Sequence, residues 1–203
     1  RKALQVAFLD REYFARVAAQ IELGGGDSAR AQRFIDELKS GGLPVEALVG
    51  LLVEHGHLDA AAAAIEDEIR NGDYTMAGDL ALTHADVFTR LGGIDRLLRT
   101  LQPLVERGHD GRLLGRVGEY LVAEGQYGKG VLYLRAAVDQ GSTQYRSLLV
   151  QTYLVLGHEA EAVGQLQAVL IETPEGSRGT VLASLAPLFE VLNLRPTLRG
   201  LLE

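Results

Sequence analysis

The chain has 203 residues, of which 47% are hydrophobic and 6% aromatic, and its formal net charge is −7. An apolar fraction of this size can bury a core, which excludes intrinsic disorder, and an acidic balance without a Lys/Arg cluster excludes a nucleic-acid-binding footprint. The absence of cysteine excludes disulfides and thiolate metal sites, and no apolar run approaches the ~20 residues needed to span a bilayer.

Apolar residues recur at steps of three and four, which predicts helices throughout the chain. Leucine, alanine and valine supply most of the apolar content, and this favours helix over sheet. The predicted elements, in chain order, are a helix fragment at 1–9, pairs at 10–23 with 28–39, 44–54 with 58–70, 75–90 with 94–107, 111–123 with 127–139 and 143–155 with 159–172, and a last helix at 177–191 that begins a sixth pair truncated at 196–203.

Two prolines, Pro103 and Pro187, lie inside these helical patterns. An interior proline removes a backbone hydrogen bond and costs ~3 kcal/mol. We therefore expect a kink or an early helix end near Arg99, and likewise near residues 182–184. Because the chain starts at Arg1, directly in a helical pattern and without methionine, we interpret it as an excised segment of a longer protein.

Glycines recur between the two helices of the predicted pairs, at Gly26, Gly56, Gly92, Gly125 and Gly157. Their spacings of 30, 36, 33 and 32 residues scatter around the period of about 34 residues of the tetratricopeptide repeat. A helix commonly ends on a left-handed residue, which glycine adopts without steric cost, so these glycines predict turns. Helices this short are marginal alone in water, so each predicted hairpin must stack on the next.

The segment from about residue 10 to residue 174 resembles the tetratricopeptide family, in which small residues lie where the two helices cross. Residues 132–157 are also similar to the related Sel1-type repeat, through the Ala-Ala step at Ala136 that leads to Gly141. The family's tryptophan is missing and its Gly-x-x-Tyr signature is incomplete. The resemblance implies an all-α fold, a right-handed α-solenoid of antiparallel helix hairpins, with a single repeat array over residues 1–203.

In solenoids of this kind the first helices of the pairs line a concave groove, at positions thirteen, ten, six and three before each turn glycine. The chaperone-binding members hold a terminal carboxylate there with Lys and Asn, and no pair in this sequence reproduces that clamp. The acids Asp79, Asp86 and Glu119 instead predict a groove that prefers a basic or polar protein partner. The predicted partner-binding residues are Tyr13, Arg16, Gln20, Glu46, Asp79, Asp86, Arg112, Glu119, Gln144 and Gln151.

The motifs of catalysis and of metal or phosphate binding are missing from the sequence. His55 and His57 flank a turn glycine without an obvious third metal ligand, and the His-Glu pair at His158 lacks the second histidine because the fifth position is Ala162. His84 falls on a predicted buried column, where a packed core histidine is expected. We therefore predict no catalytic, metal or cofactor site.

The sequence favours a protein–protein interaction scaffold over an enzyme. Its Ala-, Gly-, Arg- and Leu-rich style is typical of a high-GC bacterium, and degenerate repeats of these two types are similar to periplasmic regions of exopolysaccharide-export proteins. The alternatives are a cytoplasmic regulatory or assembly scaffold, a structural spacer, and a helical enzyme or ligand binder with a closed pocket near His84 or the His55/His57 turn. The sequence favours the periplasm over the cytoplasm without fixing the compartment, and it does not fix the oligomeric state. Membrane attachment would require parts outside this segment.

Overall fold

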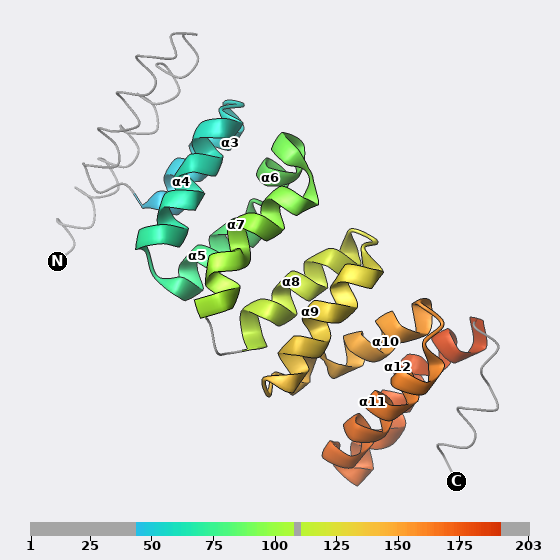
Figure 1. Cartoon of the computed structure of the whole chain (residues 1–203). Helices are drawn as coiled ribbons and strands as arrows, with labels where there is room; N and C mark the ends of the chain where they lie inside the picture. Colours follow the sequence, from blue (N-terminus) through green and yellow to red (C-terminus); the bar gives the residue numbers. More distant parts are fainter. Residues whose placement is uncertain (1–43, 108–110, 192–203) are drawn as a thin grey trace, which may run out of the picture. The chain divides into compact units, whose positions relative to one another are not determined.

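The computed structural model of the chain describes residues 44–107 and 111–191 (Figure 1). Every regular element within these ranges is a helix and none is a strand, which confirms the predicted all-α class. The helices predicted at 1–9, 10–23, 28–39 and 196–203 lie outside the described residues. The elements are α3 (Val45–Glu54), α4 (Leu58–Asn71), α5 (Tyr74–Thr83), α6 (Ala85–Gly92), α7 (Ile94–Arg107), α8 (Gly111–Ala123), α9 (Tyr127–Asp139), the short 3-10 helix η1 (Thr143–Tyr145), α10 (Arg146–Val155), α11 (Glu159–Glu172) and α12 (Glu175–Val191).

The chain forms two compact units, with the boundary between Glu106 and Arg107. In the first, α3 and α4 form a hairpin, and α4 also packs on α5 and α6. In the second, α8 pairs with α9 and α10 with α11, while α9 packs on η1 and α10, and α12 packs on α10. In each unit the helices therefore pack on helices close to them in the chain, as in an α-solenoid. The single array over residues 1–203 stays a prediction.

The prediction of one continuous helix over 75–90 is wrong. His84 (φ −108°, ψ 34°) separates α5 from α6. Thr83 and His84 are both weak helix formers, and the packing on both sides of the break involves α4. α5 itself begins where the sequence indicates, because the Asp73 carboxylate accepts hydrogen bonds from the backbone N–H groups of Thr75 and Met76, at 3.0 and 3.1 Å.

Of the two outcomes predicted at the prolines, the early helix end is wrong, since α7 includes Pro103 and α12 includes Pro187, and the kink stays a prediction. In α7 the buried residues Leu101 and Leu104 lie on both sides of the proline, so packing holds the last turns in place. Pro103 and Arg99 are exposed. Water can therefore satisfy the Arg99 carbonyl, which loses its helical partner at the proline.

The turns between paired helices use glycine in a left-handed conformation, with one correction. Gly56, Gly125 and Gly157 have φ values of 77°, 72° and 73°. At each of them the glycine N–H bonds to a carbonyl three residues earlier and the following N–H to one five residues earlier, the pattern of a Schellman motif. In the α6–α7 turn the positive-φ residue is Gly93 rather than the predicted Gly92, and its N–H bonds to the Thr89 carbonyl at 2.9 Å.

Small residues lie where paired helices cross, as the resemblance to the tetratricopeptide family implies. Ala61, Ala162 and Gly130 are all buried. In the α8–α9 hairpin a Cβ atom on Gly118 would lie 2.7 Å from Leu134 Cγ, and one on Gly130 would lie 2.8 Å from Val122 Cγ2. These distances are shorter than van der Waals contact, so glycine is what allows α8 and α9 to approach so closely.

Candidate partner-binding surface

Where the structure describes them, the predicted groove residues lie on the first helices of the pairs, except Gln144, which lies in η1 because α10 begins only at Arg146 and not at residue 143 as predicted. In the first unit Glu46 on α3 and Asp86 on α6 are exposed, and Asp79 on α5 is half-buried. In the second unit Arg112 and Glu119 on α8 and Gln144 in η1 are exposed, whereas Gln151 on α10 is half-buried. Tyr13, Arg16 and Gln20 fall outside the described residues.

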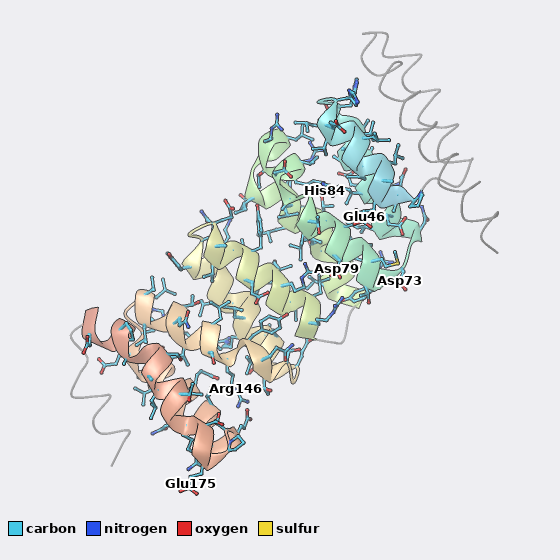
Figure 2. The ribbon with its side chains drawn as sticks, turned by 180° about the vertical axis from the view of Figure 1, so that it is seen from behind. Glu46, Asp73, Asp79, His84, Arg146 and Glu175 are labelled. Atoms are coloured by element: carbon cyan, nitrogen blue, oxygen red, sulfur yellow. The ribbon has the colours of Figure 1, made fainter. Side chains whose placement is uncertain are left out.

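Asp79 and Asp86 do not share one helix, contrary to the prediction of a continuous helix over 75–90. Asp79 and Asp86 are two helical turns apart in sequence, which would place them on one face of a continuous helix. The break at His84, labelled in Figure 2 together with Glu46 and Asp79, removes the basis of that inference. His84 itself is half-buried at the junction of α5 and α6, not fully packed in the core as expected.

In the second unit, three of the predicted groove residues lie near Tyr145, which is not among the predicted partner-binding residues. The hydroxyl group of Tyr145 donates a hydrogen bond to the Arg112 backbone carbonyl at 3.2 Å. The side chain of Gln144 also hydrogen-bonds with it, and the charges of Glu119 and Arg116 lie close enough to influence its titration. We call Tyr145, Arg112, Arg116, Glu119 and Gln144 the Tyr145 cluster.

The ring of Tyr145 packs closely against α8 at a position where only glycine leaves room for it. Tyr145 is 7% exposed, and it lies against Gly115 in the middle of α8, where an added Cβ atom would overlap the Cε2 atom of the ring. Gly115 and Leu154 belong to the wider set of positions that the repeat register assigns to the groove. Both are buried, so the positions that the repeat pattern assigns to the groove include some that pack in the core and cannot contact a partner.

The environment of the Tyr145 hydroxyl favours its neutral form. Burial is the largest cause of the raised pKa of Tyr145, and the carboxylate of Glu119 raises it further. The positive charges of Arg116 and Arg112 and the hydrogen bond with Gln144 lower that pKa but do not cancel the increase. The cluster therefore contains a buried, protonated tyrosine with one carboxylate, two guanidinium groups and an amide near it.

We expect the raised pKa of Tyr145 to appear as a loss of stability in alkali. The folded state holds this proton more tightly than the unfolded chain, so the stabilisation is complete below about pH 10, the usual pKa of tyrosine. It is lost as the pH rises through the folded-state pKa. Tyr145→Phe should therefore lose less stability than the wild type between neutral pH and pH values above about 10, as measured by urea denaturation at each pH.

The pKa of Tyr133 is also raised, chiefly by burial, although Lys129 opposes the shift. Part of the alkaline loss should therefore persist in Tyr145→Phe and decrease further when Tyr133→Phe is added. Parallel pH profiles of the wild type and Tyr145→Phe would show that the Tyr145 hydroxyl does not contribute.

Two further features bear on the alternatives to a binding scaffold. Within residues 44–107 and 111–191 no group of three or more His, Asp or Glu side chains is placed to hold a metal ion, and none of the helices there is long and apolar enough to cross a bilayer. A hollow of about 620 Å³ lies between α4 and α7. It is open to solvent and is lined by neither His84 nor the His55/His57 turn, the two places at which a helical enzyme or ligand binder was predicted to have a closed pocket.

Comparison with known proteins yields structural likenesses only. No family model matches the chain, and no curated protein matches it. Among solved structures, YrrB, described as a TPR protein with an unusual peptide-binding site, is 18% identical, with a TM-score of 0.49 over 84% of this chain and 88% of that one. MamA from Desulfovibrio magneticus RS-1 is 18% identical, with a TM-score of 0.43 over 79% of this chain and 93% of that one. What this chain binds is therefore inferred from its own side chains.

Proposed function

We propose that the chain is a protein-interaction scaffold that holds a segment of a partner protein on the Tyr145 cluster. The observation that carries the proposal is a tyrosine fixed by burial and by its hydrogen bond to the Arg112 carbonyl, with the exposed side chains of Glu119 and Gln144 near it. Binding sites combine such a rigid anchor with polar groups that select the ligand.

The chemistry of the cluster, which has two guanidinium groups, one carboxylate and an amide, fits a polar peptide segment. The Gln144 amide has both donors and acceptors, which suit the backbone of an extended peptide. The exposed carboxylate of Glu119 can pair with a Lys or Arg side chain of the partner. The exposed acids Glu46 and Asp86 of the first unit, with the half-buried Asp79, give that unit's own first-helix surface a preference for a basic segment, and we propose it as a separate contact.

Affinity capture with the full chain from its native lysate, followed by mass spectrometry, would identify the partner, and the variant Glu119→Lys/Gln144→Ala would locate its site. We expect this variant to bind the captured partner at least about tenfold more weakly, which corresponds to about 1.4 kcal/mol. Glu161→Lys is the matched control, because Glu161 is an exposed acid on the second helix α11. Undiminished binding by the cluster variant would place the contact elsewhere, and the absence of any captured partner would favour the structural-spacer alternative.

The proposal also includes the cellular setting of the chain. We propose a bacterial exopolysaccharide-export assembly, in which the scaffold recruits a partner in the periplasm, with a cytoplasmic regulatory or assembly scaffold as the alternative. The support is the similarity of the degenerate tetratricopeptide- and Sel1-type repeats to the repeat regions of export proteins. The identity of the captured partner distinguishes the two settings, since only the first predicts an enzyme or pore component of polysaccharide export.

A further inference from the structure

The second helices of the first unit carry a basic hollow, separate from the acids on the first helices. The hollow lies between α4 and α7 and beside the end of α6. Three arginines line it, Arg70 from α4 and Arg96 and Arg99 from α7, together with one carboxylate, that of Glu66. These lining residues carry three positive charges against one negative, a balance of +2 in a chain whose net charge is −7.

The existing contacts of the three arginines leave most of their donors for a ligand. A guanidinium has five N–H donors. Arg70 pairs with Asp67 at 3.1 Å, and Arg99 donates through Nε to the Asp95 carbonyl at 3.3 Å. Arg96 lies 3.7 Å from Glu66, beyond the distance of a hydrogen bond. Ion pairs this exposed contribute little stability, so an incoming anion can replace them at small cost.

Apolar surface lies beside these charges. Ile69 of α4 and Leu91 of α6 contribute to the lining, with Ile69 buried and Leu91 half-buried. The hollow is open, whereas sites for small ligands enclose most of the ligand's surface. The shape therefore suits a chain segment that lies across α4 and α7 better than a free metabolite.

We infer that this hollow binds an acidic peptide segment of a partner protein, with an Asp or Glu carboxylate on the arginines and a neighbouring apolar side chain against Ile69 and Leu91. Arginine fits this task because its planar fork can donate two parallel hydrogen bonds to one carboxylate. The acids Glu46, Asp79 and Asp86 on the first helices favour a basic segment instead, so the first unit carries two surfaces of opposite charge preference. The hollow does not depend on the proposed function of the Tyr145 cluster.

The test uses the full chain and a fluorescein-labelled peptide of alternating Glu and Leu, titrated by fluorescence anisotropy. We expect saturable binding that weakens with added salt, and at least a tenfold loss of affinity in Arg96→Gln/Arg99→Gln. The matched control Arg90→Gln/Arg135→Gln removes two exposed arginines that do not line the hollow, and it should bind like the wild type. Arg96→Lys should show an intermediate loss, because it keeps the charge but lacks the fork.

Several outcomes would overturn the inference. These are equal binding by the wild type and Arg96→Gln/Arg99→Gln, an equal loss in the matched control, and equal binding of a peptide in which Lys replaces Glu. Displacement of the peptide by inorganic phosphate at lower concentration than by unlabelled peptide would assign the hollow to a phosphate ligand instead. Far-ultraviolet circular dichroism shows whether each variant is folded, and Glu119→Lys, which alters only the Tyr145 cluster, should leave this peptide's affinity unchanged.

Discussion

Alanine at position 115 is expected to destabilise the second unit by about 1–3 kcal/mol, the usual cost of overpacking a close-fitted contact. A Cβ atom on Gly115 would overlap the Tyr145 ring, which is buried and tied to the Arg112 carbonyl and so cannot move aside freely. Helix propensity alone predicts the opposite sign, since alanine is favoured over glycine inside a helix by up to about 1 kcal/mol. The free energy of unfolding, from urea denaturation followed by circular dichroism, decides between the two.

A double-mutant cycle tests whether the Tyr145 ring causes the loss of stability in Gly115→Ala. Tyr145→Ala alone should cost about 3–5 kcal/mol, the range for truncating a buried aromatic side chain. In that background Gly115→Ala should become neutral or stabilising, because its new methyl group meets no ring. Gly164→Ala is the control, since Gly164 is exposed in the middle of α11 and an added Cβ meets nothing within 4 Å. An equal cost of Gly115→Ala in both backgrounds would contradict the assigned fit.

The sequence predicted those hairpins whose helices begin and end at residues with a clear local preference, such as a turn glycine. The ranges predicted for α8 and α9, 111–123 and 127–139, agree with the structure. The α8–α9 turn is fixed by Gly125, whose conformation is a local property of a glycine after an apolar helical run. The break at His84 and the continuity of α7 through Pro103 depend on packing against other helices, and local propensity does not contain that information.

The candidate sites were only partly predictable for the same reason. The repeat register assigned Arg112, Glu119 and Gln144 to the predicted groove, but it did not show that they lie near Tyr145. One signal was present. Gly115 is a glycine inside a helical pattern and away from any turn, which usually indicates close packing against something large. No comparable signal in the sequence marks the arginines of the basic hollow. Arg70 is far in sequence from Arg96 and Arg99, so the three do not form a local cluster of charge.

A large loss of stability is also expected from a substitution in α6, which is only eight residues long. A helix this short has little stability of its own and depends on its buried face. Phe88 is 0% exposed and is the largest buried side chain of α6, a helix that packs on α4. We expect Phe88→Ala to destabilise the first unit by about 3–5 kcal/mol, since it removes apolar burial and leaves a cavity.

Met76→Ala is the matched control for Phe88→Ala, because Met76 is 63% exposed on α5 and its truncation should change the free energy of unfolding by no more than about 0.5 kcal/mol. Hydrogen exchange gives a sharper readout. If Phe88 anchors α6, the amides of residues 88–92 should lose protection in Phe88→Ala before those of α4 do. Equal loss in both helices would mean that α4, α5 and α6 unfold together, and that the break at His84 does not separate their stabilities.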